Sequence, residues 1–329
     1  MGVDLDDPEL AAAVRDKLAM VEEELRASVH SADPFVTEAA RHLVDAGGKR
    51  FRPLLVLLAA HLGDADAPEV VRSAVVMELT HLATLYHDDV MDEAQIRRGA
   101  PSANRRWSNS VAILVGDYLF SRAADLAADL GTEAVRIQAR TFTRLVHGQI
   151  AETVGPRPGA DPVAHYLQVI ADKTGSLIAT CAQFGAMFGK APAEVVRAVA
   201  GYGETIGVAF QLSDDLLDIA SDAEQSGKTP GTDLREGVRT LPVLYALASD
   251  EADSASVRLR EILAAGAVTD EALHAEALGL LRESVALKRA RETVRAYAED
   301  ARARLASLPD VPARRALESL CDVITDRTA

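Results

Sequence analysis

The stretch VVRSAVVMELTHLATLYHDDVMD, residues 70–92, repeats apolar residues at three- and four-residue spacing. This spacing is the period of an α-helix, so the stretch predicts one long helix. It ends in three aspartates within five positions, Asp88, Asp89 and Asp92. A helix that buries an apolar face has no structural need for so much negative charge at one end.

The helical period recurs along most of the chain, at residues 111–130, 136–154, 193–219 and 271–305. Alternating β patterns are nearly absent, and the helix-favouring residues Ala, Leu, Glu and Arg are abundant. The sequence therefore predicts an all-α chain of about ten or more helices. We expect a single domain over residues 1–329, with a motif-bearing core at about 40–245 and C-terminal helices at about 250–329.

Prolines mark boundaries rather than interrupt this pattern. Pro53 and Pro242 each precede an apolar run and suit the first turn of a helix, where a missing N–H does no harm. VGPRPGADP, residues 154–162, and SGKTPGTD, residues 226–233, predict loops.

Composition excludes several classes of protein. The chain has 329 residues, 48% of them hydrophobic, and a formal net charge of −15. This charge argues against nucleic-acid binding but allows an anionic small substrate in a locally basic site. Two cysteines are too few for a disulfide framework, and the N-terminal sequence MGVDLDDPEL lacks the regions of a signal peptide. No apolar run reaches the roughly 18 residues of a membrane span. We therefore expect a cytoplasmic protein without a transmembrane segment.

A second aspartate cluster, FQLSDDLLDIASD, contains Asp214, Asp215 and Asp218 at the same D-D-x-x-D spacing. On a helix, the first and last aspartate of each cluster share a face, where like charges destabilise by a few tenths of a kcal/mol per pair. One such cluster is equally well explained as a solvated helix end. Two copies, each followed by a basic loop, favour a divalent cation, and Mg²⁺ prefers a few carboxylates together with phosphate oxygens.

Basic residues accompany glycines or apolar helices in four short motifs. GGKRFRP contains Lys49, Arg50 and Arg52, IRRG contains Arg97 and Arg98, DKTGS contains Lys173, and SGKTPG contains Lys228. Flexible backbone beside a cation lets a phosphate approach closely. Together with the carboxylates, these motifs match the needs of two diphosphates. His81, two helical turns before Asp88, is either a hydrogen-bonded helix histidine or a donor to a phosphate.

These motifs resemble, in order and number, those of the trans-isoprenyl diphosphate synthases, the polyprenyl synthetase family. The resemblance covers about residues 40–245 through GGKRFRP, LYHDDVMDEAQIRRG, NRRWSNSVAILVGDYLFS, DKTGSLI, FQLSDDLLD and GKTPGTDL. It implies an isoprenoid-synthase-type helical bundle around a central substrate cavity, a homodimer, and a set of three Mg²⁺ ions. In GVRTLP, residues 237–242, Arg239 replaces the more usual lysine and keeps its charge.

The resemblance also implies roles for individual residues. Isopentenyl diphosphate would be bound by Lys49, Arg52, His81 and Arg98, and the allylic diphosphate by Arg97, Lys173 and Lys228. Thr174 and Gln211 would direct oxygen dipoles at the allylic cation. Metal ligands would come from Asp88, Asp89 and Asp92 and from Asp214, Asp215 and Asp218, with Asp88, Asp92 and Asp214 foremost.

Product length depends on the helix that carries the first cluster. Thr84 and Ala83, four and five residues before Asp88, are small where family members with short products tend to carry a bulky aromatic residue, and Thr80 lies one turn earlier. An open tunnel at these positions predicts a product of roughly C30 to C50, with a floor at Met77 or Phe142. Alternatively, Ala83 and Thr84 only pack against a neighbouring helix.

Other functions remain open from the sequence. A short-chain farnesyl or geranylgeranyl diphosphate synthase would use the same motifs. A terpene cyclase usually has a different second metal motif, with Asn or Asp, then Ser or Thr, then Glu. A regulatory subunit of a heteromeric synthase typically loses one aspartate cluster or the GKR group, both of which are present here.

Overall fold

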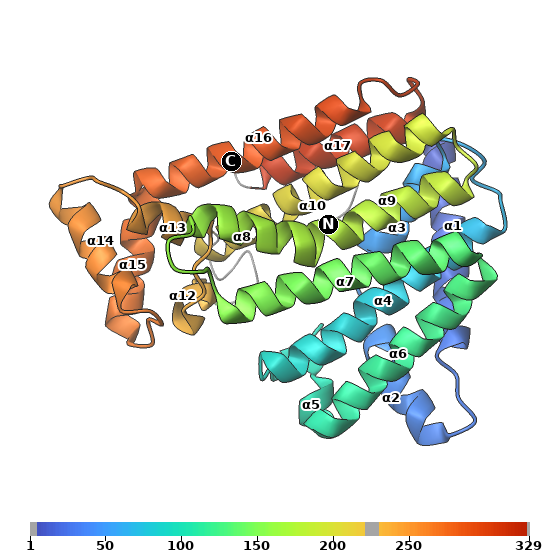
Figure 1. Ribbon diagram of the computed structural model, residues 1–329, viewed down its shortest axis with the longest axis horizontal. Helices are drawn as coiled ribbons and strands as arrows, with labels where there is room; N and C mark the ends of the chain where they lie inside the picture. The colour runs from blue at the N-terminus through green and yellow to red at the C-terminus, as the bar shows by residue number, and fades with distance from the viewer. Residues whose placement is uncertain (1–4, 221–229, 328–329) are drawn as a thin grey trace. The chain divides into compact units, whose positions relative to one another are not determined.

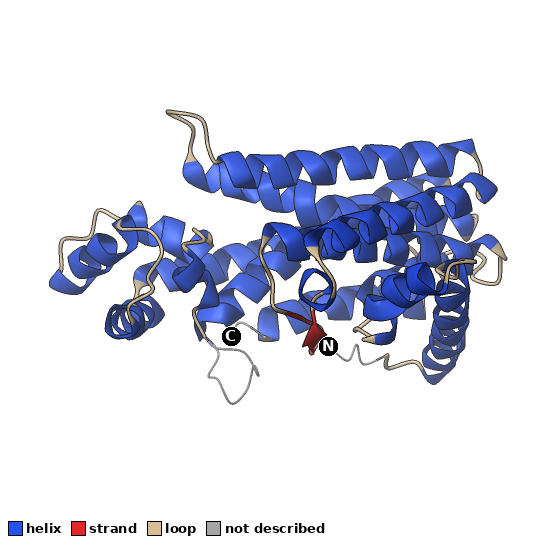
Figure 2. Ribbon diagram, turned by 90° about the horizontal axis from the view of Figure 1, so that it is seen from below, coloured by secondary structure: helices blue, strands red, loops and turns tan. Residues whose placement is uncertain are grey.

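The structure is a computed structural model that describes residues 5–220 and 230–327. Figure 1 labels its α-helices, and Figure 2 shows that helices make up nearly all of the regular structure apart from one short hairpin. The elements are α1 (Pro8–Ser28), α2 (Pro34–Asp45), α3 (Phe51–Ala60), α4 (Glu69–Met91), β1 (Ile96–Arg97), β2 (Ala100–Pro101), α5 (Ala103–Arg106), α6 (Asn109–Asp129), α7 (Thr132–Val154), α8 (Pro162–Ile170), the π-helical turn η1 (Ala171–Gly175), α9 (Ser176–Phe188), α10 (Ala193–Ala220), α12 (Thr232–Glu236), α13 (Leu241–Leu247), α14 (Ser254–Ala264), α15 (Glu271–Glu283), α16 (Val285–Leu305) and α17 (Pro312–Asp326). The prediction of an all-α chain is confirmed.

Three helices begin at an Asp-Pro pair. Asp7, Asp33 and Asp161 are the N-caps of α1, α2 and α8, and each carboxylate accepts a hydrogen bond from a backbone N–H of the first turn. The proline that follows lacks an N–H where none is needed and has a helical φ already. Pro53 and Pro242 also lie in the first turns of α3 and α13, as predicted.

Two predicted boundaries were wrong. The helical run at 271–305 is broken at Ser284, which is extended and caps α16 with its hydroxyl. Periodicity alone missed this break because the apolar spacing continues through it. The loop predicted at 226–233 gives way to α12 at Thr232, and residues 226–229 lie outside the described residues.

The chain forms two compact units. Unit 1 contains the residues up to Thr143, with Leu177–Gly203 and Ser307–Leu317; unit 2 contains Arg144–Ser176, Glu204–Ala306 and the residues from Glu318 onward. The chain passes between the units several times, so they are not consecutive halves of the sequence. The single domain over 1–329 therefore stays a prediction.

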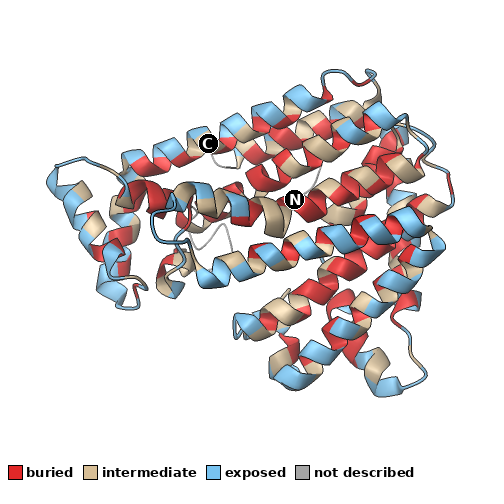
Figure 3. Ribbon diagram, in the orientation of Figure 1, coloured by how far each residue is buried: buried red, intermediate tan, exposed pale blue. Residues whose placement is uncertain are grey.

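In unit 1, α4 packs against α1, α3 and α6 and is buried along most of its length (Figure 3). Helices with apolar residues on every side are typical of such a central position. The α6 helix comes close to α4 because Gly116 has no side chain, and a Cβ there would collide with the ring of His87. Tyr86 anchors α4 to α2 by donating to the carbonyl oxygen of Ala39 over 2.6 Å.

In unit 2, α13 packs against α8, α14 and α16, and α15 packs against α14 and α16. The buried face of α16 is rich in alanine, at Ala286, Ala290, Ala298 and Ala301, which permits close helix packing. None of the described helices is both long enough and apolar enough to cross a membrane.

Candidate active site

The first aspartate cluster lies at the C-terminal end of α4, in unit 1. Asp92 is the C-cap, and its backbone N–H still donates to the carbonyl oxygen of Asp88 over 2.8 Å. Helical geometry therefore continues through the cluster, and Asp88 and Asp92 share one side of α4, as predicted. The last turn of α4 contains no basic residue, and negative charge is unfavourable at a helix C-terminus. A bound cation would offset this charge.

Asp89 faces into the protein and is fully buried. Its Oδ1 accepts a hydrogen bond from Nε of Arg97 over 2.6 Å. Its Oδ2 is buried without a hydrogen-bond partner in the described part of the chain. A buried carboxylate oxygen without a partner is costly, so this atom would also gain from a cation.

A short hairpin, with strands β1 and β2 of two residues each, positions the two arginines that follow the cluster. Arg98 and Gly99 form its turn, both with positive φ, at 54° and 78°. Arg97 reaches back to Asp89, whereas Nη1 of Arg98 donates to the carbonyl oxygens of Leu43, over 3.1 Å, and Gly47. The two side chains therefore point in different directions, as expected for neighbours in a hairpin.

The GGKRFRP motif forms the loop before α3 and its first turn. The guanidinium of Arg98 lies against Gly48, where a Cβ would come within 2.9 Å of its Cζ. Lys49 is exposed, and Arg52 is half-buried with an Nε that has no hydrogen-bond partner among the described residues. Burial lowers the pKa of Arg52, although Cys181, Glu78 and Asp88 act in the opposite direction. Arg52 thus keeps a buried N–H that no described residue satisfies.

His81 lies close to Arg52 and Arg98, near enough for their charges to affect it. Burial lowers the pKa of His81 well below its ordinary value, and the nearby charges of Arg52, Arg98, Arg97 and Arg50 lower it further. The imidazole is therefore neutral at pH 7. The structure brings His81, Arg52 and Arg98, three of the residues predicted to bind isopentenyl diphosphate, into one electrostatic neighbourhood.

The second aspartate cluster lies near the C-terminal end of α10, in unit 2. Asp214 pairs with Nη2 of Arg327 over 2.6 Å. Asp215 accepts hydrogen bonds from the hydroxyl of Tyr166 and from Nε2 of Gln211, the latter over 3.0 Å. Asp218 accepts from the backbone N–H groups of residues 232 and 233, both over 3.1 Å.

Burial raises the pKa of Asp215 well above its ordinary value, and the carboxylates of Asp233, Asp218 and Glu152 raise it further. Unit 2 therefore concentrates negative charge around Asp215. A divalent cation is a direct way to neutralise such a group.

Lys173 and Thr174 lie on η1, which interrupts the long helix formed by α8 and α9. Single π-helical turns of this kind are frequent at functional sites. Nζ of Lys173 pairs with Glu152 over 2.6 Å, and Oγ1 of Thr174 donates to Oε1 of Gln211 over 3.3 Å. Thr174 and Gln211 are thus together, as the resemblance implies. Lys228 lies outside the described residues.

Several residues that contact the predicted site carry no signal in the sequence. Tyr166 and Glu152 carry no recognisable motif, and Asp233 is the last residue of the predicted loop. Arg327 comes from the C-terminal helices, in which the sequence shows little chemistry. A lone tyrosine or arginine gives no signal until the fold places it beside a carboxylate.

The donor set fits a hard divalent cation. Within residues 5–220 and 230–327, no three carboxylate, histidine or cysteine side chains are gathered as a coordination group. Mg²⁺ usually binds through one or two carboxylates, with waters and substrate phosphates filling its remaining positions. Single or paired carboxylates suit an ion whose coordination is completed by water and substrate. They do not suit a structural metal whose ligands all come from the protein.

The residues predicted to set product length are all buried. Oγ1 of Thr80 accepts from Nε2 of Gln138 over 3.2 Å, and Oγ1 of Thr84 donates to the carbonyl oxygen of His81 over 2.8 Å. Ala83 is fully buried, and its carbonyl oxygen faces Gly116 of α6. Of the two candidate floor residues, Met77 is buried and Phe142 packs against Phe120 at 4.3 Å between ring centroids.

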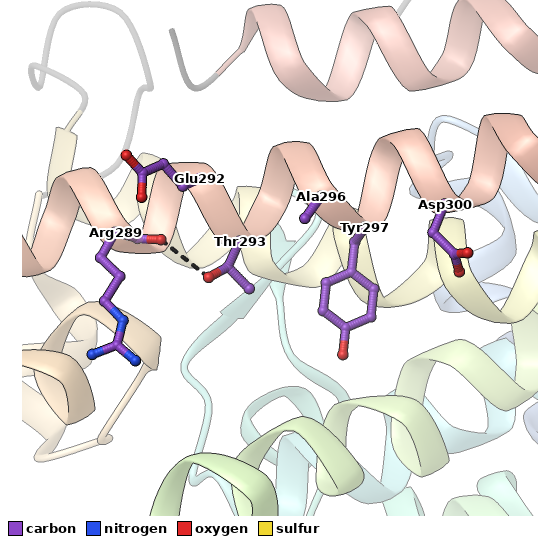
Figure 4. A pocket seen from close by; sticks show the side chains of 6 residues that line it. All are labelled: Arg289, Glu292, Thr293, Ala296, Tyr297 and Asp300. Carbon is purple, nitrogen blue, oxygen red and sulfur yellow. Dashed lines mark hydrogen bonds between the residues drawn. The ribbon is translucent and has the colours of Figure 1, made fainter.

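A separate hollow of about 520 Å³ runs along α16 in unit 2 (Figure 4). Its lining residues are Arg289, Glu292, Thr293, Ala296, Tyr297 and Asp300. It contains none of the residues predicted to bind substrate or metal, so we do not assign the active site to it.

Comparison with known proteins defines the class to which this fold and site belong. Residues 33–280 match the polyprenyl synthetase family, and the chain belongs to that family. This confirms the prediction of a prenyl diphosphate synthase, a transferase of prenyl groups.

Individual relatives are similar over nearly their whole length. The nonaprenyl diphosphate synthase of Mycobacterium tuberculosis is 51% identical over 99% of this chain and 97% of its own. The structure of a geranylgeranyl pyrophosphate synthase from Corynebacterium glutamicum, complexed with calcium and isoprenyl diphosphate, has a TM-score of 0.90 and 45% identity, with 99% of both chains covered. A decaprenyl diphosphate synthase from Rhodobacter capsulatus has a TM-score of 0.86 and 36% identity, covering 98% of this chain and 99% of its own.

Proposed function

We propose that this enzyme condenses an allylic diphosphate with isopentenyl diphosphate repeatedly, giving a polyprenyl diphosphate of roughly C30 to C50. The observation that carries the proposal is that unit 1 places aspartates close to cationic side chains. Asp88 and Asp92 share one side of α4, and Arg52 and Arg98 lie with the neutral His81 in one neighbourhood, where Arg52 is near enough to Asp88 for their charges to interact. Two diphosphates need this combination of metal ligands and cations.

Asp88, Asp92 and Asp214 would hold Mg²⁺, in a set of three ions, and the remaining aspartates of both clusters would support them. When bound, the metal neutralises the diphosphate and makes it a better leaving group. Arg97 and Lys173 would bind the allylic diphosphate, together with Lys228. In the structure Arg97 pairs with Asp89, and Lys173 pairs with Glu152. On binding, each cation would leave its carboxylate and contact a substrate phosphate instead.

The second substrate would be held by Lys49, Arg52, His81 and Arg98. The exposed Lys49 and the positive charge of the Arg52 guanidinium attract the diphosphate, and neutral His81 can donate one N–H without adding charge. These contacts orient the isopentenyl double bond toward the allylic carbon.

The reaction then follows from charge. The allylic C–O bond breaks, and diphosphate leaves with the electron pair. Oxygen dipoles of Thr174 and Gln211 stabilise the resulting allylic cation. The isopentenyl double bond forms the new C–C bond, and a proton is lost to regenerate an alkene, with the released diphosphate as its acceptor. Each cycle lengthens the chain by one isoprene unit.

We further propose a homodimer. The α6 helix leaves two adjacent large apolar side chains exposed, Ile113 at 44% and Leu114 at 65%. Burial of such side chains against a second copy would remove them from water. The cytoplasmic location expected from the sequence also belongs to this proposal.

One assay tests the function. The purified protein is incubated alone with allylic diphosphate, isopentenyl diphosphate and Mg²⁺, and the product is resolved by chromatography. We expect a linear polyprenyl diphosphate that disappears when the metal is chelated. A product that stops at C15 or C20 would identify a short-chain synthase, a cyclic hydrocarbon would identify a terpene cyclase, and no product would indicate a subunit that needs a partner.

A further inference from the structure

Glu78 is a buried carboxylate that the mechanism above does not use. It lies on α4, ten residues before Asp88, with 1% of its surface exposed. Buried carboxylates are rare in proteins unless they are paired. Oε1 of Glu78 accepts from Nη1 of Arg50 over 3.0 Å and lies 3.6 Å from Nη2 of Arg98. One oxygen atom therefore contacts arginines from two separate loops.

Both arginines have an unfavourable backbone conformation. Their φ angles are 46° for Arg50 and 54° for Arg98, in the left-handed region. The described residues contain four non-glycine residues with positive φ, and two of these four meet at Glu78. A strained backbone persists only where its surroundings hold it in place. The contacts of Glu78 are the part of that restraint that both loops share.

Arg50 itself is fully occupied by the protein. Its guanidinium contacts both carboxylate oxygens of Glu22, the carbonyl oxygens of Val44 and Gly47, and Glu78. Arginine has five N–H donors, and five contacts use them all. Arg50 is therefore a structural residue, although it lies in the same motif as Lys49 and Arg52.

The loops held in this way carry cations assigned to isopentenyl diphosphate. Lys49 and Arg52 flank Arg50, and the guanidinium of Arg98 rests on the same loop at Gly47 and Gly48. We propose that Glu78 is a positioning residue that fixes both loops and thereby preorganises the isopentenyl diphosphate site. This inference rests on the proposed function, because that function assigns the substrate to these cations.

Two physical effects of Glu78 have opposite signs. Its negative charge weakens the positive field on the substrate, so its removal alone would tighten diphosphate binding. Its contacts hold the strained loops, so its removal would also let the cations move apart and weaken binding. Positioning dominates if Glu78→Gln, which has nearly the same shape but lacks the charge, binds the substrate less tightly.

The test compares kinetic constants and binding of Glu78→Gln, Glu78→Asp and wild type. We expect Glu78→Gln to raise the KM for isopentenyl diphosphate by about tenfold or more and to change the KM for the allylic substrate by less than about twofold. Glu78→Asp keeps the charge but withdraws it from Arg50, so we expect a smaller rise in the same constant. Circular dichroism checks that each variant folds. If Glu78→Gln does not fold, the KM of Glu78→Asp for isopentenyl diphosphate tests the inference instead.

The matched control is Glu24→Gln. Glu24 of α1 pairs with Arg72 of α4 at 3.2 Å, and this pair is partly exposed and includes neither Arg50 nor Arg98. Exposed ion pairs contribute little to stability, so both KM values should stay unchanged.

A double-mutant cycle adds a second measurement. If Glu78 acts through Arg98, the effect of Glu78→Gln on isopentenyl diphosphate should be much smaller in an Arg98→Ala background than in wild type. Equal rises in both KM values, tighter binding of isopentenyl diphosphate, or additive effects in the cycle would each overturn the inference.

Calorimetric titration with isopentenyl diphosphate separates this inference from the function. If wild type binds isopentenyl diphosphate but makes no product, the proposed reaction is contradicted. The role of Glu78 is then tested by whether Glu78→Gln binds isopentenyl diphosphate more weakly than wild type. Wild type that does not bind isopentenyl diphosphate would overturn the inference as well.

Discussion

At the scale of single residues, the middle aspartates of the two clusters are held inside the protein. Asp89 is fully buried against Arg97, and Asp215 is buried against Tyr166 and Gln211. Asp88 and Asp92 share the other side of α4. The spacing D-D-x-x-D thus gives each cluster a buried middle aspartate that is held by hydrogen bonds within the protein.

The metal role assigned to Asp88 and Asp214 predicts a large loss of turnover. We expect Asp88→Ala and Asp214→Ala each to lower kcat by at least about a hundredfold, which is the scale for loss of a major electrostatic group. Turnover is measured at saturating Mg²⁺. Near wild-type turnover in either variant would show that the metal role of that residue is wrong.

The different directions of Arg97 and Arg98 predict a division of labour. Arg97→Ala should mainly raise the KM for the allylic substrate, and Arg98→Ala should mainly raise that for isopentenyl diphosphate. Steady-state kinetics with each substrate varied in turn measures both constants. Similar changes in both constants for both variants would contradict the division.

The low pKa of His81 predicts a loss of stability in acid. Unfolded histidine takes up a proton near its ordinary pKa of 6.5, whereas folded His81 resists protonation. The free energy of unfolding should therefore fall as pH drops below about 6.5, by at most about 1.4 kcal/mol from this group at pH 5.5. Urea unfolding at pH 7 and 5.5 should show a smaller loss for His81→Gln than for wild type. The same loss in both proteins would rule out this contribution.

At the scale of elements, α4 combines two tasks in one helix. It is buried on nearly every side, so its sequence is apolar all round, and its C-terminal end carries the first aspartate cluster. The substrate chain would extend along α4 past Thr84, Ala83 and Thr80. The π-helical turn η1 has a comparable role in unit 2, where it interrupts a long helix at Lys173 and Thr174.

The small residues on α4 predict that an added ring shortens the product. Ala83→Phe or Ala83→Tyr should shift the product to about C15 or C20 while the first condensations continue, because the ring fills space needed by the growing chain. Chromatography of the products measures the shift. Ala139→Phe, at an exposed position of α7, is the matched control.

Unchanged product length in Ala83→Phe would favour the alternative, in which Ala83 only packs against a neighbouring helix. The close approach of α4 and α6 at Gly116 makes this alternative a concrete one.

At the scale of the whole molecule, the proposed homodimer predicts a change in mass on mutation of α6. Leu114→Glu places a charge in the middle of the exposed apolar pair, and a buried unpaired charge is costly. We expect wild type to sediment as a dimer and Leu114→Glu to shift toward monomer at the same concentration. A monomeric wild type, or a variant that dimerises equally well, would contradict this interface.

The sequence by itself determined the all-α class, the two aspartate clusters and the family. These features depend on residues within a few positions of each other, because helical periodicity, Asp-Pro caps and D-D-x-x-D spacing are all local. That Thr174 and Gln211 serve the same site was expected only through resemblance to the family, and their hydrogen bond came from the fold.

Only the tertiary structure decided which charges meet. Arg50 and Glu78 are 28 residues apart, and Arg327 and Asp214 are 113 apart. An arginine or a glutamate looks the same in sequence whether it faces solvent or a buried partner. The inward position of Asp89, the full occupation of Arg50 and the strained loops at Glu78 follow from how α1, α3 and α4 pack, and such long-range contacts leave no local pattern in the sequence.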